Sequence, residues 1–369
     1  MPRPPGPRRA TGETDPPPGG SLMTPIWTPA ERRARSLGAL LVAIALAGCA
    51  GAGTSAPGST PAPSPTIDAS AEPTVTPMPT VRTTWDIPPY EVLVKLFAYD
   101  PTEPLGYTQT EAHSTEQAEG STVYDISYQS GGNTVPAKLV MPDGPGPFPA
   151  VLYAHGLTLG PGFFVPEMQE FARQGYAGLA ILGPERRAPF SRFVIFDADE
   201  EIASHVGYVT DLRRAIDVLE TLPTINATRL GFAGHSLGCQ VGSILSGVDD
   251  RIDAFVLMSC PGGYVSDPVW GWAPMKGVGT DEERARYLDR IAVLNAANYV
   301  SHNEGAAFLV QGDKDDYGPN IQALFDAAVE PKTLTWYKGG HGLGCETFGA
   351  CDPALPAFAD HRAWLKEHV

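Results

Sequence analysis

The chain has 369 residues, and its 42 acidic against 26 basic side chains give a formal net charge of −16 at pH 7. Such an acidic surface repels the phosphate backbone of nucleic acids, which argues against a nucleic-acid enzyme. The sequence contains no Cys-x-x-Cys pair and no His-Glu-x-x-His motif. It therefore predicts neither a metal site nor a cofactor.

The N-terminal region predicts export. Three arginines at positions 32–35 precede an apolar run over residues 37–47. A basic stretch followed by a short apolar run is typical of a secretory signal peptide, and this run is shorter than the roughly 20 residues that span a bilayer. We therefore assign residues 1–48 to a signal region. The proline-rich start of the chain is unlike a signal peptide, so Met23 is an alternative start.

The apolar run ends in Leu-Ala-Gly-Cys at positions 46–49. This tetrapeptide resembles the bacterial lipobox, in which the cysteine is acylated and becomes the first residue of the mature protein. Lipidation at Cys49 predicts a cell-surface or periplasmic lipoprotein. The alternative is an ordinary secretory signal with an incidental cysteine, and the protein is then simply secreted.

Residues 49–84 predict a tether and residues 85–369 a single catalytic domain. After Cys49, the first of these segments consists almost entirely of Ala, Gly, Ser, Thr and Pro. Such a composition cannot bury enough apolar surface to offset the entropy of ordering the chain. The remaining length is normal for one α/β domain.

The domain begins with a hairpin pattern, in which β-rich runs at 122–128 and 134–141 flank a Gly-Gly turn. Six further short apolar runs predict strands, at 150–154, 177–182, 230–233, 254–258, 307–311 and 333–337. Helical patterns lie between them, at 166–174, 201–221, 237–246, 320–328 and 357–367. Strands that alternate with helices predict an α/β fold with a mostly parallel central sheet of about eight strands and helices on both faces. Active sites of such sheets lie at the carboxyl ends of the strands.

The segment Gly-His-Ser-Leu-Gly at 234–238 has the Gly-x-Ser-x-Gly pattern of a nucleophile elbow. It follows a predicted strand and precedes a predicted helix, and this sharp turn exposes a serine hydroxyl at the strand tip. Small residues are needed on both sides because the helix crosses close behind the serine. Ser236 is therefore the candidate nucleophile, the alternative being a serine that only caps the helix.

A serine nucleophile needs a histidine base, and the base needs a carboxylate that fixes its tautomer. Two later strands end in suitable loops: one in Gly-Asp-Lys-Asp-Asp at 312–316, the other in Gly-Gly-His-Gly at 339–342. His341 is the candidate base. Asp315 is the candidate acid, with Asp316 and Asp313 as competitors.

The oxyanion of the tetrahedral intermediate needs two backbone N–H donors. We expect one from Leu237, the residue after the nucleophile. The turn after the strand at 150–154 supplies the other, and Leu157 is the candidate there. His155 and His235 are expected to support the site without belonging to the triad.

Two pairs of cysteines remain. Cys345 and Cys351 follow the histidine loop closely, and in an oxidising compartment they predict a disulfide that stiffens it; two free thiols are the alternative. Cys239 and Cys260 follow buried segments and are expected to be packed thiols without a bridge.

From about residue 120 to its end, the chain resembles a serine α/β-hydrolase, and most closely the dienelactone-hydrolase-like and acyl-peptidase-like esterases. The resemblance rests on the His-Gly turn at 155–156, the elbow at 234–238 and the acid loop at 312–316. In that family the acid falls three residues after the loop glycine, which selects Asp315. One departure is that dienelactone hydrolases proper use a cysteine nucleophile, where this chain has Ser236.

The expected function is hydrolysis of a carboxylic ester, small or polymeric, through an acyl-enzyme intermediate. One alternative is a serine peptidase of the acyl-peptidase or prolyl-oligopeptidase kind, although residues 85–120 are too few for the propeller that usually accompanies such enzymes. The other is a non-catalytic surface-binding protein built on the hydrolase fold.

Overall fold

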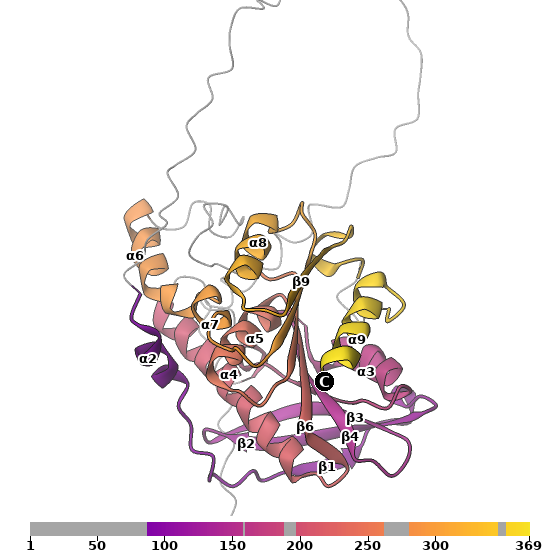
Figure 1. The fold of residues 1–369 in the computed structure, drawn as a ribbon. Helices are drawn as coiled ribbons and strands as arrows, with labels where there is room; N and C mark the ends of the chain where they lie inside the picture. The colour runs from indigo at the N-terminus through magenta and orange to yellow at the C-terminus, as the bar shows by residue number, and fades with distance from the viewer. Residues whose placement is uncertain (1–86, 158, 188–196, 262–279, 346–351) are drawn as a thin grey trace, which may run out of the picture. The chain divides into compact units, whose positions relative to one another are not determined.

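The computed structural model describes residues 87–157, 159–187, 197–261, 280–345 and 352–369. The predicted signal region, Cys49 and the tether lie outside these residues. Within them, a nine-stranded sheet has the strand order β1-β2-β3-β5-β4-β6-β7-β8-β9 (Figure 1). None of the helices found there is both long enough and apolar enough to cross a bilayer.

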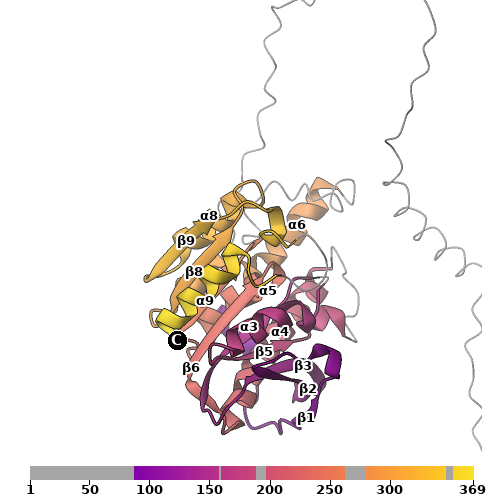
Figure 2. The same ribbon diagram turned by 90° about the vertical axis from the view of Figure 1, so that its right-hand side faces the viewer.

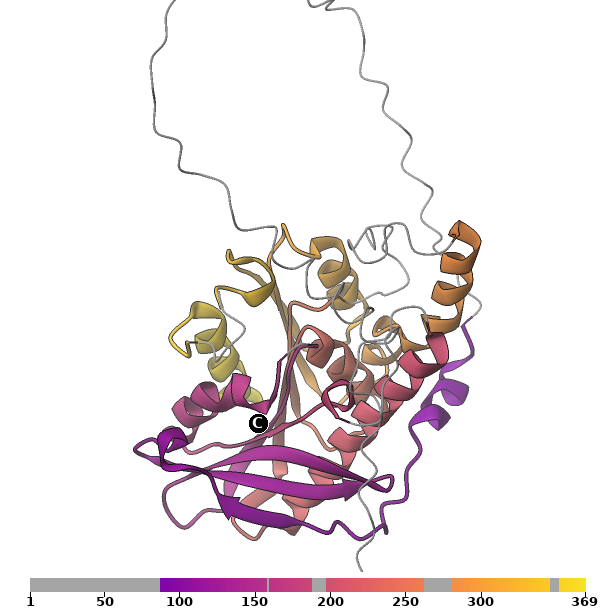
Figure 3. The ribbon, with the colours of Figure 1, turned by 180° about the vertical axis from the view of Figure 1, so that it is seen from behind.

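The first three strands form an antiparallel edge of the sheet, visible from behind in Figure 3. They are β1 (Thr108–Glu111), β2 (Ser121–Ser130) and β3 (Asn133–Pro142). Gly131 and Gly132 connect β2 to β3 with φ angles of +55° and +75°. Two successive positive φ angles are what a tight two-residue hairpin turn requires, so the predicted hairpin is confirmed.

The other six strands run parallel to one another. They are β4 (Phe148–Ala154), β5 (Ala177–Ile181), β6 (Ile225–His235), β7 (Ala254–Met258), β8 (Ala307–Gly312) and β9 (Lys332–Trp336). Every residue of β5, β7 and β8 is buried, in keeping with sequences that are apolar except for Gln311 near the end of β8. Because β4 lies between β5 and β6, the direction of winding reverses there, and such a switch point opens a crevice at the carboxyl ends of the strands.

Helices cover both faces of the sheet, as predicted (Figures 1 and 2). On one face, α3 (Val165–Ala172) and α9 (Pro356–His368) pack their apolar side chains into one buried cluster. On the other, α4 (Ala198–Thr221), α5 (Leu237–Val248) and α8 (Gly318–Ala327) contribute to a second, larger cluster. The sheet thus has a hydrophobic core on each face, and the loops at the ends of its strands are left for a functional site.

The sequence patterns missed several elements. The sheet has nine strands instead of about eight, because β1 was not predicted. Other unpredicted elements are α2 (Tyr90–Leu93), α6 (Asp281–Ile291), α7 (Ala297–Val300) and the short 3-10 turns η1 (Val94–Phe97), η2 (Ser114–Glu116), η3 (Pro161–Phe164), η4 (Pro184–Arg186), η5 (Ala292–Leu294) and η6 (Gly340–Gly342). Helix α6 begins with a capping box, in which Thr280 and Glu283 each bond the other's backbone.

Candidate active site

Ser236 occupies the sharp turn between β6 and α5, with φ 57° and ψ −116°. An L-residue rarely adopts this conformation, and here the serine backbone N–H donates to the Met258 carbonyl of the neighbouring strand at 2.9 Å. The flanking glycines are sterically required. A Cβ at Gly234 would lie 2.3 Å from the Gly238 carbonyl oxygen, and one at Gly238 would lie 1.9 Å from the Ala154 carbonyl oxygen. The local geometry is that of a nucleophile elbow.

His341 reaches the serine from the loop after β9. Its Nε2 lies 2.8 Å from the Ser236 hydroxyl oxygen. The loop takes this path because Gly339 and Gly340 adopt φ angles of +142° and +62°, which favour glycine. The histidine predicted as the base is therefore in contact with the serine predicted as the nucleophile.

The prediction of Asp315 as the partner of His341 is wrong. The His341 Nδ1 instead lies 2.8 Å from Oδ2 of Asp316. The reason is a tight turn after β8, in which the Asp316 N–H donates to the Asp313 carbonyl oxygen at 3.1 Å. Asp315 occupies the corner of this turn, where its side chain is 82% exposed and pairs with Lys338 at 2.8 Å. Asp316 follows the corner and points back toward the histidine.

These contacts fix the tautomer of His341. A carboxylate only accepts hydrogen bonds, so the proton of the neutral imidazole is on Nδ1 and faces Asp316. Nε2 is then free to accept the Ser236 hydroxyl proton. The three side chains form a continuous relay in which a serine can be deprotonated as it attacks. Among the described residues, no cluster of three or more His, Cys, Asp or Glu side chains is arranged to hold a metal ion.

The turn after β4 passes directly beside the nucleophile. A Cβ placed on Gly156 would lie 3.2 Å from Cβ of Ser236. Leu157, one of the predicted oxyanion donors, is the next residue of this turn. Leu237, the other, is the first residue of α5, and the first N–H groups of a helix have no partner within it. Leu237 is thus adjacent to the serine in sequence and Leu157 follows a residue that contacts it, and the role of both backbone amides in stabilising an oxyanion stays a prediction.

His155 joins the turn after β4 to the segment that follows β5. Its Nδ1–H donates to the Gly156 carbonyl at 2.8 Å, and its Nε2 accepts from the Gly183 N–H at 3.1 Å. Both bonds require a neutral ring, and burial lowers the pKa of His155 to about 4. As expected, this histidine supports the turn and takes no place in the triad.

His235 ties the elbow to the histidine loop. Its Nε2–H donates to the backbone carbonyl of His341 at 2.8 Å. Burial, with a smaller contribution from the nearby His341 ring, lowers the pKa of His235 to about 4. His235, the residue before Ser236, thus holds the loop that carries His341.

Aromatic side chains surround the histidine pair. The Phe163 ring lies 5.5 Å from the His235 ring, and the Tyr317 ring contacts the His341 ring edge-on at 5.4 Å between centroids. Tyr317 immediately follows Asp316, so the acid loop also supplies a wall of the site. Sequence reasoning did not identify this tyrosine.

The prediction that Cys239 and Cys260 are separate thiols is wrong, because they form a disulfide with a Cα–Cα distance of 5.2 Å. Cys239 lies in the first turn of α5 and Cys260 just after β7. The pairing of β6 with β7 brings these two positions together. Cys345 is also disulfide-bonded, whereas its predicted partner Cys351 lies outside the described residues.

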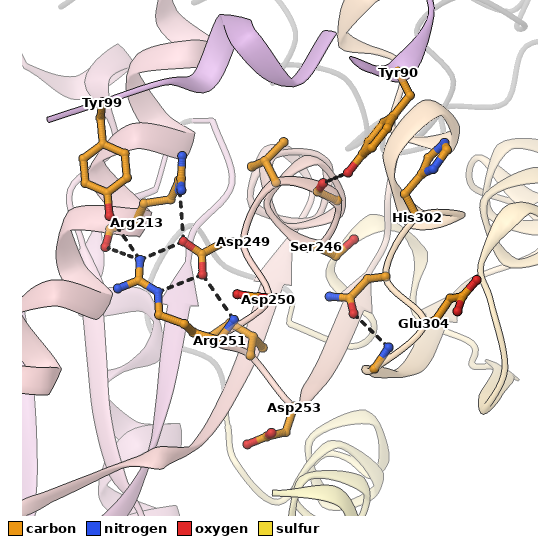
Figure 4. A pocket seen from close by; sticks show the side chains of 15 residues that line it. Tyr90, Tyr99, Arg213, Ser246, Asp249, Asp250, Arg251, Asp253, His302 and Glu304 are labelled. Carbon is orange, nitrogen blue, oxygen red and sulfur yellow. Dashed lines mark hydrogen bonds and ion pairs between the residues drawn. The ribbon is translucent and has the colours of Figure 1, made fainter. Parts of the chain in front are cut away.

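A cavity of about 570 Å³ lies near the amino ends of β7 and β8, whereas Ser236 follows the carboxyl end of β6. On one side Arg213 and Arg251 both bond Asp249, and on the other Tyr90 stacks on His302 (Figure 4). Because these arginines already have carboxylate partners, they neutralise the protein's own acids. Tyr90 also donates to the Gly247 carbonyl and Arg213 to the Phe97 carbonyl, so this cluster anchors the N-terminal segment of the domain.

No protein-family model matches the chain. Among solved structures, acetyl xylan esterase 1 from Thermoanaerobacterium sp. JW/SL YS485 matches with a TM-score of 0.61 at 13% identity, over 79% of this chain and 98% of that one. An acetyl xylan esterase from Paenibacillus sp. R4 matches with a TM-score of 0.58 at 17% identity, over 76% and 93%. A hypothetical protein from Pseudomonas aeruginosa, PA2218, matches with a TM-score of 0.52 at 15% identity, over 71% and 100%. The chain has the α/β-hydrolase fold of these structures.

Proposed function

We propose that this protein hydrolyses carboxylic esters through an acyl-enzyme intermediate, with Ser236 as nucleophile, His341 as general base and acid, and Asp316 as the residue that orients His341. One observation carries the proposal. The Ser236 hydroxyl, both ring nitrogens of His341 and the Asp316 carboxylate form an unbroken series of two 2.8 Å contacts. This is the arrangement that activates a serine for acyl transfer.

In the first half of the reaction, the Ser236 oxygen attacks the ester carbonyl carbon and its proton moves to Nε2 of His341. The negative charge that forms on the carbonyl oxygen is stabilised by the backbone N–H groups of Leu157 and Leu237. Collapse of the tetrahedral intermediate breaks the bond to the alcohol, which leaves with the proton from Nε2. The acyl group remains on the serine.

In the second half, a water molecule gives a proton to Nε2 and attacks the acyl-serine. Collapse of the second intermediate returns the proton to the serine oxygen and releases the acid. Throughout, the Asp316 carboxylate stabilises the imidazolium that forms transiently on His341. The reaction needs no group beyond those already in the site and water.

We propose a short acyl group for the substrate. The Leu159 side chain lies beside the turn that carries Leu157, 3.5 Å from the position that a Cβ on Gly156 would occupy. Phe163 is buried and its ring packs against His235, which also contacts this turn. The fold is shared with two acetyl xylan esterases, whose names specify an acetyl ester on a polysaccharide. Acetyl esters are therefore the first substrates to test.

The test is hydrolysis of p-nitrophenyl esters from acetate to dodecanoate, with Ser236→Ala as the control. We expect turnover that is greatest for acetate or butyrate and that disappears in the variant. Equal activity of Ser236→Ala would contradict the proposed nucleophile. If the folded protein hydrolyses no ester of the series but does cleave peptide p-nitroanilides, the serine peptidase alternative holds. If it cleaves neither, the non-catalytic surface-binding protein is the favoured alternative.

We also propose that the enzyme is exported and anchored through a lipid on Cys49. The basic stretch, the apolar run and the Leu-Ala-Gly-Cys sequence support this proposal. Radiolabelled palmitate should be incorporated into the protein in a bacterial host and not into Cys49→Ala. Labelling of both proteins, or of neither, would contradict an anchor at this residue.

A further inference from the structure

Asp313, the first residue after β8, binds two loops with one carboxylate. Its Oδ2 accepts the Gly339 N–H at 3.0 Å and the Gly340 N–H at 2.9 Å. Its Oδ1 accepts the Asp315 N–H at 3.0 Å. The residue is only 4% exposed. All three bonds go to backbone amides, so Asp313 differs in role from the other acidic residues of the loop.

The two glycine amides belong to the residues directly before His341. A Cβ on Gly339 would lie 2.3 Å from the backbone nitrogen of Gly344, so the loop cannot replace this glycine with a stiffer residue. Successive glycines leave a backbone free to adopt many conformations, and an ordered loop therefore needs bonds that select one of them. The bonds from Asp313 act at this point of the histidine loop.

The same residue also shapes the acid loop. Its carboxylate holds the Asp315 amide, and its own carbonyl oxygen accepts the Asp316 N–H at 3.1 Å. These two bonds close the turn that directs Asp316 toward His341. Asp313 thus fixes the backbone at both ends of the hydrogen bond between the His341 ring and the Asp316 carboxylate.

The carboxylate is well suited to this role because it is held in its charged form. Hydrogen bonds from the backbone amides, first that of Asp315 and then that of Gly340, lower the pKa of Asp313 below its usual range. An anionic oxygen accepts N–H donors more strongly than a neutral one does. An amide side chain in its place has one acceptor oxygen for donors that lie on two sides.

We propose that Asp313 is a positioning residue for ester hydrolysis: it clamps the histidine loop to the acid loop and so sets the alignment of His341 between Asp316 and Ser236. This inference rests on the proposed function, since alignment matters only if the relay works. If Asp313 only stabilised the fold, its replacement would lower the stability of the protein and leave the kcat of the folded enzyme unchanged.

The first experiment compares Asp313→Ala with Asp315→Ala in p-nitrophenyl acetate hydrolysis. Misplacing a catalytic group by about 1 Å costs on the order of 100-fold in rate, so we expect Asp313→Ala to lower kcat about 10- to 100-fold with KM changed less than about threefold. Asp315→Ala is the matched control, because among the described residues that carboxylate bonds the exposed Lys338 and no other side chain, and its kcat should stay within about twofold. Asp313→Asn keeps the shape of the side chain and should give an intermediate loss.

The second experiment repeats Asp313→Ala in an Asp316→Ala background. If Asp313 acts through the His341–Asp316 pair, removing it from an enzyme that lacks the pair should cost less than about threefold. An equal loss in both backgrounds would overturn the proposal. So would a kcat for Asp313→Ala within about twofold of the wild type.

A third readout does not depend on turnover. The His341 Nδ1 proton, held against a carboxylate, should give a downfield proton NMR resonance that is absent in His341→Gln. We expect this resonance to be lost or shifted in Asp313→Ala and Asp313→Asn at a temperature where both are folded. If the wild type hydrolyses no ester, the proposed function fails, and this resonance alone decides the positioning role. Its retention unchanged in Asp313→Asn would overturn that role.

Discussion

The His235 Nε2–H donates to the backbone carbonyl of His341 at 2.8 Å, so the residue before Ser236 holds the loop that carries His341. The two segments that carry the reacting groups, the tip of β6 and the loop after β9, are therefore joined directly. His235 is buried and neutral, which leaves its Nδ1 without a proton. This contact makes the alignment of Ser236 and His341 depend on a third residue, His235, which is not in the series of contacts from Ser236 to Asp316.

Removing the hydrogen bond between His235 and the His341 carbonyl should lower the catalytic rate. We expect His235→Ala to lower kcat about tenfold, because the histidine loop loses a bond that fixes its distance from the serine. His235→Gln places an amide N–H near the position of the ring Nε2–H and should retain activity within about threefold. Steady-state kinetics on p-nitrophenyl acetate distinguishes the two variants. Equal activity of His235→Ala and the wild type would show that the contact is dispensable.

The titration of His235 should appear in the pH dependence of stability. Its pKa is about 4 in the folded protein and is close to the ordinary value of 6.5 in the unfolded chain. The unfolded state therefore takes up a proton first as the pH falls, so the stability contributed by this residue is complete above about pH 6.5 and is lost toward pH 4.

His235→Gln isolates this effect from the other buried acids and bases, because glutamine keeps the donor and does not titrate. Urea unfolding of both proteins at pH 7 and pH 4 should show the wild type losing up to about 3 kcal/mol relative to the variant over that interval. A difference between the two proteins that stays constant with pH would contradict a buried neutral His235.

Variants of two neighbouring aspartates, Asp315 and Asp316, test which carboxylate orients His341. Asp316→Ala should lower kcat about 1000-fold or more, because His341 loses the group that sets its tautomer and stabilises its charged form. Asp315→Ala removes a contact with an exposed lysine, Lys338, and its kcat should lie within about twofold of the wild type. The opposite pattern, a large loss at Asp315 and a small one at Asp316, would contradict the geometry of the loop.

The disulfide between Cys239 and Cys260 should stabilise the protein around the nucleophile. The two cysteines are 21 residues apart in the sequence. For a loop of this length, the lower entropy of the cross-linked unfolded chain stabilises the folded protein by about 3 kcal/mol. Both cysteines are fully buried, so the double variant Cys239→Ala with Cys260→Ala should lower the free energy of unfolding by at least this amount. Urea unfolding at pH 7 measures the loss, and an unchanged midpoint would contradict a formed bridge.

Much of the fold could be predicted from the sequence, because the patterns that indicate it lie within short stretches of the chain. The strands of the parallel sheet are short continuous apolar runs, and the elbow combines a strand, a glycine-flanked serine and a helix in one stretch. Strand β1 was missed because all four of its residues are exposed and show no apolar alternation. The Cys239–Cys260 bridge was missed because its two ends meet only through the pairing of β6 with β7.

The sequence could not identify which aspartate contacts His341. Three of the four residues from 313 to 316 are aspartates, and their chemistry as isolated side chains is the same. Their roles diverge because one clamps backbone amides, one faces solvent and one faces His341. That division is decided by the turn after β8 and by its partner loop after β9. A spacing rule counted from the loop glycine does not contain this information.

The central claim, that Ser236 is activated by His341, is tested most directly by reaction with a fluorophosphonate followed by peptide mass spectrometry. We predict one adduct on Ser236 in the wild type and labelling at least about 100-fold slower in His341→Ala, with no adduct in Ser236→Ala. A folded wild-type protein that stays unlabelled, or that carries its adduct on a different residue, would contradict the account.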